Sequence, residues 1–301
     1  MAAGVPMEAP YMEKSFLNRE ESPLSDQDWQ HIDETVVNVA KRMLVGRRFL
    51  HVFGPMGVGI QDVDYDVFSG TGPAQLAVFG ETETSVVRAD KRVHENIPLI
   101  YKDFMIYWRD IETSRQMGMP LDVSAAAAAS SFVAQREDHM IFNGDAECGY
   151  EGLANASGRI GMTARDWSQP GNGFQDVVDG TARLLSAGFY GPYAVIVNPK
   201  SYAQFHRVYA NSGVLEINHI REIASSGVFQ TPALGDVPGL VVSCGIQNFD
   251  VAIGQDLVTA YLGPENMNHP FRVFESLVLR IKRPGAICTF EAGRPAAKRA
   301  S

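Results

Sequence analysis

One stretch decides the fold: Phe249-Asp250-Val251-Ala252-Ile253-Gly254-Gln255-Asp256-Leu257-Val258-Thr259-Ala260-Tyr261. It opens with an aspartate and a short strand-like run, continues through a Gly-Gln-Asp turn and ends in a second apolar run. This order predicts a strand-turn-strand corner in a packed domain. We therefore interpret Asp250, Gln255 and Asp256 as corner-forming residues and expect none of them to act as a catalyst.

The composition sets wider bounds. The chain has 301 residues, 45% of them hydrophobic and 20% charged, so it is long enough for one large or two moderate globular domains. The low charged fraction permits extensive contacts between subunits, because interface cores are depleted in charge. The formal net charge of -9 argues against a general nucleic-acid binder, which usually carries a basic patch.

The spacing of the cysteines and the length of the apolar segments indicate the cellular compartment of the protein. Cys148, Cys244 and Cys288 are widely separated, which favours reduced thiols over a disulfide framework or a metal knuckle. The first residues show no basic start followed by an apolar run. The longest apolar block, residues 123–134, is too short to span a bilayer. We expect a soluble, cytoplasmic protein with no membrane partner.

A first helix is predicted to begin after Ser25, which can cap it while Asp28 occupies the capping-box position. Apolar residues then recur at steps of three and four and form one stripe, made of Trp29, Ile32, Val36, Val39, Ala40 and Met43. Gly46 can end this helix. Residues 52–111 follow as a predicted extended segment, because glycine and proline interrupt it repeatedly and residues 63–68, 76–79 and 85–88 read as short strands. Such a segment is predicted to project as an arm that packs on something else.

A second long helix is predicted over residues 124–142, with Asp122 or Ser124 at its start and Gly144 at its end. Five consecutive alanines, residues 125–129, favour the helix and allow a neighbour to approach closely. Later helices are expected near residues 174–186, 200–209 and 216–225, and strands at 194–197, 240–244, 251–253 and 271–281.

The candidate chemical motifs are weak. Residues 54–59 have the spacing GxxGxG, not the GxGxxG of a dinucleotide fingerprint, and are interpreted as a turn cluster. Glu137, Asp138 and His139 are adjacent on a helix, so we expect them to point apart and form separate ion pairs. No HExxH is present, and no serine lies in GxSxG. We predict no catalytic residue and no metal site.

Trp108 is the best candidate among the aromatic residues for stacking on a ligand. It lies between Tyr107 and Arg109, and an exposed Trp beside an Arg can stack a planar ligand. The alternative is a strand aromatic packed at an interface, and we favour that alternative.

The quoted stretch closely resembles a signature of the encapsulins, a family of shell-forming proteins. Further segments resemble the same family in the family's order, over about residues 13–290. They comprise residues 44–49 with 54–57; Ala134, Glu137, Asp138, Ile141, Phe142 and Gly144; residues 191–196; and Phe274, Glu275, Ser276, Arg280 and Pro284. Residues 100–104, 108–112 and 267–273 look most like iron-storage members of the family.

The resemblance implies an α+β chain with the HK97 phage-capsid-like fold, made of a peripheral domain, an extended loop and an axial domain. The expected division is an N-terminal segment (1–23), an N-terminal helix that starts the peripheral domain (24–51), the extended loop (52–94) and the peripheral domain with its spine helix (95–150). The axial domain (151–263), return strands of the peripheral domain (264–290) and a disordered tail (291–301) follow. An arm of this kind needs a neighbouring subunit to cover its strand edges.

The function implied by the resemblance is that of a self-assembling shell protein, not an enzyme. Its partners would be other copies of itself, in an icosahedral nanocompartment, and a ferritin-like iron oxidase that carries a short targeting peptide. Iron would then be stored in the lumen through the cargo, with protection against oxidative stress. The shell protein itself would need no cofactor, although some encapsulins hold a flavin against an aromatic residue, and Trp108 could do so here.

The resemblance also implies two sets of site residues. The cargo peptide is expected along the first helix, at Ile32, Val36, Val39 and Met43. The five-fold pore is expected to be lined by Ala210, Asn211, Ser212 and Gly213. Two other functions remain as alternatives: a phage major capsid protein of the HK97 type, and a protease or bacteriocin-like enzyme.

Overall fold

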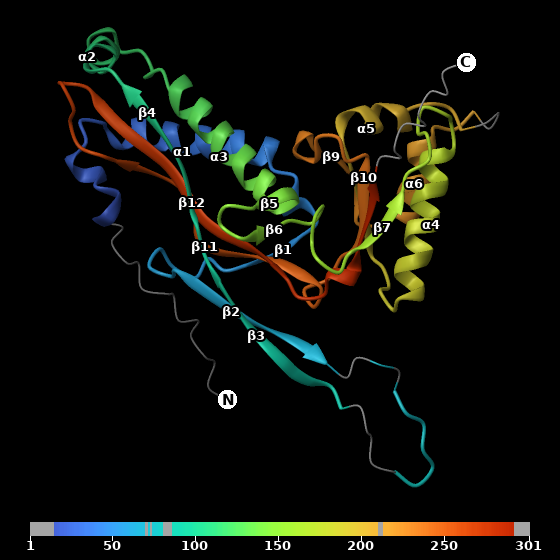
Figure 1. Ribbon diagram of the computed structural model, residues 1–301. Helices are drawn as coiled ribbons and strands as arrows, with labels where there is room; N and C mark the ends of the chain where they lie inside the picture. The colour runs from blue at the N-terminus through green and yellow to red at the C-terminus, as the bar shows by residue number, and fades with distance from the viewer. Residues whose placement is uncertain (1–14, 70–71, 73, 81–85, 210–212, 292–301) are drawn as a thin grey trace, which may run out of the picture.

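A long four-stranded sheet forms the centre of the first of two lobes (Figure 1). The structure is a computed structural model that describes residues 15–69, 72, 74–80, 86–209 and 213–291. The sheet has the order β1-β11-β12-β4, with β1 (His51–Phe53) parallel to β11 and the remaining pairs antiparallel. Its central strands β11 (Phe249–Tyr261) and β12 (His269–Ile281) contain 13 residues each. β4 (Leu99–Ile106) forms the other edge.

The predicted corner at residues 249–261 is wrong, because this stretch is the single strand β11. Its pairing with β12 shifts register between Ile253 and Val258, so the expected turn is a bulge inside a strand. A Cβ at Gly254 would lie 2.7 Å from the Ser276 Oγ, and the same Oγ accepts a hydrogen bond from the Gln255 N–H. Glycine therefore allows the two strands to approach closely enough for the bulge to be bonded.

Two helices cover one face of this sheet. α1 (Asp26–Met43) begins as predicted, since Ser25 and Asp28 form a capping box, but it ends at Leu44 instead of Gly46. Gly46 lies in the short 3-10 helix η3 (Gly46–Arg48). α3 (Ser124–Asn143) ends at Gly144, as predicted. The Ser130 hydroxyl donates to the Val36 carbonyl oxygen at 2.7 Å, so the small residues of α3 bring it close to α1.

A helix follows β4 where an extended segment was expected. α2 (Trp108–Met117) carries one buried residue, Ile111, and ends at Gly118 in the left-handed conformation. Because most of its residues are exposed, the sequence has no apolar period to reveal it. Trp108 therefore starts a helix, and its interpretation as a strand aromatic is wrong.

A second lobe contains a five-stranded sheet with the order β7-β13-β10-β8-β9. Its strands are β7 (Ile160–Thr163), β8 (Tyr193–Val197), β9 (Gly227–Gln230), β10 (Gly239–Ser243) and β13 (Ile287–Glu291), and its helices are α4 (Asn172–Ser186), α5 (Pro199–Phe205) and α6 (Glu216–Ile223). Alternate residues of β8 serve two cores: Ala194 and Ile196 join the core of the first lobe, and Val195 and Val197 join the core under the helices. The core of the first lobe thus continues into the second lobe, which has a further core under its helices.

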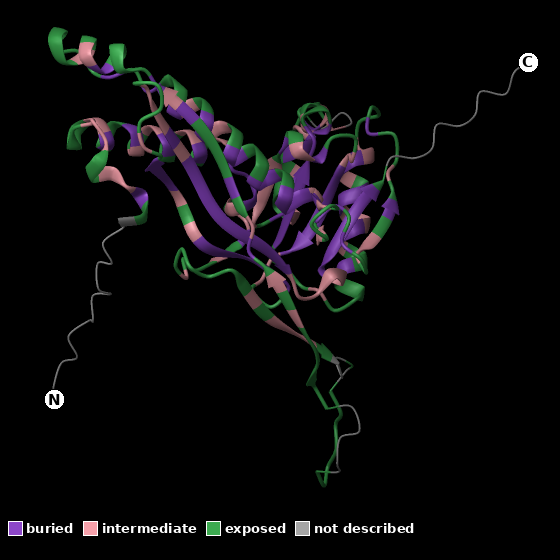
Figure 2. Cartoon of the chain, turned by 60° about the vertical axis from the view of Figure 1, so that its left-hand side comes forward, coloured by how far each residue is buried: buried purple, intermediate pink, exposed green. Residues whose placement is uncertain are grey.

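The predicted arm is present as a two-stranded ribbon that leaves the body (Figures 1 and 2). It consists of β2 (Asp62–Ser69) and β3 (Arg88–Asn96), paired antiparallel. At its root, the Met56 N–H donates to the Ile253 carbonyl oxygen at 2.9 Å, and Gly54 has a φ of 112° and no room for a Cβ against that oxygen. Residues 76–79 are described but form no strand, and residue 85 lies outside the described residues.

The sheet topology differs from the expected division at two strands. β11, expected in the axial domain (151–263), pairs with β1 and β12 of the long sheet. β13, expected among the return strands (264–290), pairs with β7 and β10 of the second lobe. Of the tail expected to be disordered (291–301), Glu291 is the last residue of β13, and residues 292–301 lie outside the described residues.

Several short elements complete the chain: η1 (Ser15–Leu17), η2 (Arg19–Glu21), β5 (Gly144–Asp145), β6 (Tyr150–Glu151), η4 (Pro232–Leu234) and η5 (Pro284–Ala286). Within the described ranges, no helix combines the length and the apolar character that crossing a membrane requires.

Candidate functional site

The four residues predicted to bind cargo fall into two groups. Ile32 and Val36 are 0% and 1% exposed and belong to the core between α1, α3 and the long sheet. Val39 and Met43 are half-buried. Only the second pair therefore has surface with which to touch another molecule, while Ile32 and Val36 support the helix from below.

Met43 opens onto an apolar groove of about 420 Å³ between the two lobes. Its walls come from the end of α1, from α3 and from η4 with the preceding threonine; the lining residues are Met43, Ala134, Gln135, Asp138, His139, Thr231, Pro232 and Ala233. The Asn143 side-chain amide donates to the Ala233 carbonyl oxygen at 2.6 Å and ties η4 to α3. Sequence reasoning missed the η4 wall, because residues 231–233 are far from α1 in the chain.

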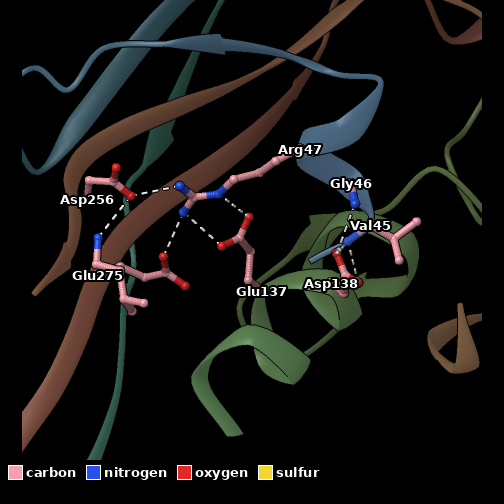
Figure 3. A network of polar contacts seen from close by, with 8 residues as sticks. Val45, Gly46, Arg47, Glu137, Asp138, Asp256 and Glu275 are labelled. Atoms are coloured by element: carbon pink, nitrogen blue, oxygen red, sulfur yellow. Dashed lines mark hydrogen bonds and ion pairs between the residues drawn. The ribbon is translucent and has the colours of Figure 1, made fainter. Parts of the chain in front are cut away.

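A buried polar network lies at the junction of η3, α3, β11 and β12 (Figure 3). Arg47 holds Glu137 with both Nε and Nη2, at 2.7 and 2.8 Å. Its Nη2 also donates to Glu275 at 2.7 Å, and its Nη1 donates to Asp256 at 2.7 Å. Burial alone would lower the pKa of Arg47, but the hydrogen bonds and charges of Glu137, Glu275 and Asp256 together outweigh burial and raise it. Arg47 therefore stays charged and joins four elements.

The three adjacent residues 137–139 point apart, as predicted. Asp138 points to the start of η3 and accepts hydrogen bonds from the Val45 and Gly46 N–H groups, each at 3.0 Å. Burial raises the pKa of this carboxyl to about 6. The expectation of separate ion pairs holds for Glu137, but Asp138 bonds to backbone and His139 lines the groove. Among the described residues, no three metal-binding side chains come together.

The remaining predicted sites lie elsewhere. Trp108 is 39% exposed at the start of α2, with the Arg109 guanidinium 6.0 Å from its ring centroid. A flavin stacked on Trp108 stays a prediction. Of the predicted pore residues, Ala210, Asn211 and Ser212 lie outside the described residues. Gly213 is exposed with a φ of 73°.

The long sheet under two helices, the second lobe and the projecting ribbon together define the class of protein: a capsid-type subunit (Figure 1). The crystal structure of a virus-like particle from Pyrococcus furiosus matches it with a TM-score of 0.71 at 23% identity, over 87% of this chain and 99% of that one. The fold is the α+β HK97-type capsid fold, as predicted.

A family model described as encapsulating protein for peroxidase matches residues 13–278. The type 1 encapsulin shell protein EncA of Myxococcus xanthus is 52% identical over 92% of this chain and 96% of its own length. Two fusion proteins are also similar. A diheme-cytochrome-encapsulin shell fusion of Kuenenia stuttgartiensis is 44% identical over 89% of this chain and 74% of its own, and a ferritin-like-encapsulin shell fusion of Pyrococcus furiosus is 27% identical over 68% and 55%.

The chain therefore belongs to the encapsulin family of shell proteins. Its role is that of a structural subunit that assembles into a capsid-like shell, as the resemblance implied. The phage capsid alternative shares the fold alone, and the enzyme alternative has no support, since the relatives are named as shell proteins.

Proposed function

We propose that the shell formed by this chain encloses a ferritin-like iron oxidase in the cytoplasm and serves iron storage and protection against oxidative stress. The proposal is supported by the similarity to a protein in which a ferritin-like part and an encapsulin shell part are one chain. It is further supported by the resemblance of residues 100–104, 108–112 and 267–273 to iron-storage encapsulins.

The groove beside Met43 is the proposed docking site of a short cargo tail. Its volume of about 420 Å³ falls in the range of about 300–1,000 Å³ that is typical of small-ligand sites, which suits a few side chains of an extended peptide. Its walls are largely apolar, and the Met43 side chain, the Ala134 methyl group and Pro232 provide surface for apolar side chains. A disordered tail would bind one groove weakly, because it loses conformational freedom on binding.

Assembly makes weak docking sufficient. Each subunit of a shell carries one groove, so a cargo oligomer with several tails meets many grooves at high effective concentration. Multivalency of this kind can raise the overall affinity by about 10²–10⁴ without any new contact. Cargo loading is thus expected to depend steeply on the affinity of a single groove.

Substitutions in the groove test this proposal. We predict that Met43→Asp lowers the amount of cargo per shell at least about tenfold, because a docked apolar tail would bury an unpaired carboxylate. Pro232→Asp changes the opposite wall at an exposed position, where folding is less affected, and should act in the same direction. The measurement is the ratio of cargo to shell protein in purified particles, after co-expression with a ferritin-like protein of the same organism.

The matched control is Val37→Asp, which lies on the same helix, is 36% exposed and does not line the groove. Its loading should equal that of the unmodified shell. Val36→Asp is unsuitable, because Val36 is 1% exposed and a charge there would unfold the core. Intact Met43→Asp and Pro232→Asp shells with full cargo would disprove the groove assignment, and loaded shells that take up no iron would disprove the iron-storage role.

A further inference from the structure

The Arg47 network contains more negative charge than its single cation can balance. One guanidinium serves three carboxyl groups, those of Glu137, Glu275 and Asp256 (Figure 3). The Asp256 side chain is 55% exposed and is solvated by water. The Glu137 and Glu275 side chains are 0% and 1% exposed, so two buried carboxyl groups compete for one buried positive charge.

The two carboxyl oxygens of Glu275 differ in their hydrogen bonds. Its Oε2 accepts from Arg47 Nη2, which is also bonded to Glu137 Oε2, so the two carboxyl groups meet at one nitrogen. Its Oε1 is buried and has no donor among the described residues. A carboxylate oxygen without a donor in the interior is strongly unfavourable. A proton on the Glu275 carboxyl group removes the excess charge, and an unbonded oxygen of a neutral group is less costly to bury than that of a carboxylate.

The groups with the largest effect on Glu275 include no second positive charge. The largest electrostatic influences on Glu275 are the charges of Glu137, Arg47 and Asp256, of which only Arg47 is positive. Asp138, the next residue of α3, is directed at the η3 backbone. On the neighbouring strand β4, the residue opposite Glu275 is the apolar Ile100.

We propose that Glu275 is protonated at neutral pH and donates a hydrogen bond to Glu137, which makes this junction a proton-binding site built into the subunit. Burial, followed by the charge of Glu137 and a hydrogen bond between the two groups, raises the pKa of Glu275 well above its ordinary value of 4.5. Paired carboxyl groups that share one proton are a known consequence of like charges at short distance.

The proposed proton lies at the root of the arm. η3 leads directly into β1 and the arm, and Arg47 fastens it to α3, β11 and β12. The folded chain binds this proton more tightly than the unfolded chain, so the stability of the fold falls as pH rises from about 4.5 until the folded pKa is passed. Loss of this proton therefore destabilises the junction at the root of the arm.

Infrared spectroscopy tests the proton directly. The whole protein in D₂O near neutral pH should show the carbonyl band of a protonated carboxyl group, and Glu275→Gln should lack it. In Glu137→Gln one buried carboxylate faces Arg47 alone, so Glu275 ionises and the band should also disappear. A difference spectrum without this band would overturn the proposal.

Thermal unfolding across pH provides a second readout. The melting temperature of Glu275→Gln should rise relative to the unmodified protein by about 2–4 °C per pH unit at most, from about pH 4.5 upward, and level off once the proton has left. Glu112→Gln, an exposed change on α2, should follow the unmodified profile. A constant difference between the Glu275→Gln and unmodified curves would overturn the proposal, even if Glu275→Gln were more stable throughout.

Discussion

At the scale of single residues, two similar ion pairs differ in what surrounds them. Arg280 holds Asp250 with Nε and Nη2, at 2.7 and 2.8 Å, between β12 and β11. Arg272 holds Asp103 in the same two-bonded way, at 2.6 and 2.8 Å, between β12 and β4. The Arg280 and Asp250 side chains are 8% and 0% exposed, whereas those of Arg272 and Asp103 are 31% and 45% exposed. The bonding geometry of the two pairs is nearly the same, but the Asp250 pair is buried and Asp250 also accepts a hydrogen bond from Lys282 Nζ at 2.7 Å.

We predict that Asp250→Ala lowers the free energy of unfolding by about 3–5 kcal/mol, because it leaves the buried Arg280 charge without its partner. Asp103→Ala should cost at most about 1 kcal/mol, because water can solvate Arg272. Denaturant unfolding of both variants measures the difference. Equal losses would show that the Asp250 pair is hydrated in solution.

At the scale of elements, the alanine run of α3 shows how a helix separates a buried face from an exposed one. Ala126 and Ala129 are 0% and 3% exposed and face the core, whereas Ala125 and Ala128 are exposed. The sequence alone predicts the helix but not which methyl groups are enclosed, because five identical residues carry no amphipathic pattern.

Ala126→Leu should lower the free energy of unfolding by about 1–3 kcal/mol, because the added atoms have no space in the packed core. Ala128→Leu makes the same chemical change at an exposed position and should alter stability by no more than about 0.5 kcal/mol. Thermal or denaturant unfolding distinguishes the two. Similar small effects would mean that the core around Ala126 can expand.

Elements with a local signal could be predicted, and those that depend on distant partners could not. The capping box at Ser25 and the end of α3 at Gly144 are local and were predicted correctly. The sequence predicts two strands in place of β11, because Gly254 and Gln255 resemble a turn. The pairing with Ser276 on β12 makes these residues a bulge inside one strand. The sequence pointed to one wall of the groove and not to the other. Met43 lies on the predicted stripe, whereas Pro232 and Ala233 reach the groove only because η4 contacts α3.

At the scale of the whole molecule, the arm is the part that a single chain leaves unpacked. Leu76, Val78 and Phe79 are 102%, 89% and 91% exposed, while the two lobes bury a continuous core (Figure 2). Neighbouring apolar side chains that are this exposed are rare in monomers and mark an interaction surface. In a shell, another copy of the chain is available to cover them.

We therefore predict that the double change Leu76→Ser and Phe79→Ser leaves the subunit folded but prevents particle formation. Each large apolar side chain contributes about 1.5–3 kcal/mol when it becomes fully buried, and the loss is repeated at every contact of the shell. Circular dichroism should show an unchanged fold, while light scattering and electron microscopy should show small oligomers. Val37→Ser, a comparable change on α1, should still give complete particles. Complete particles from the double variant would show that the arm tip is not needed for closure, and that the contacts holding the shell together lie on the two lobes.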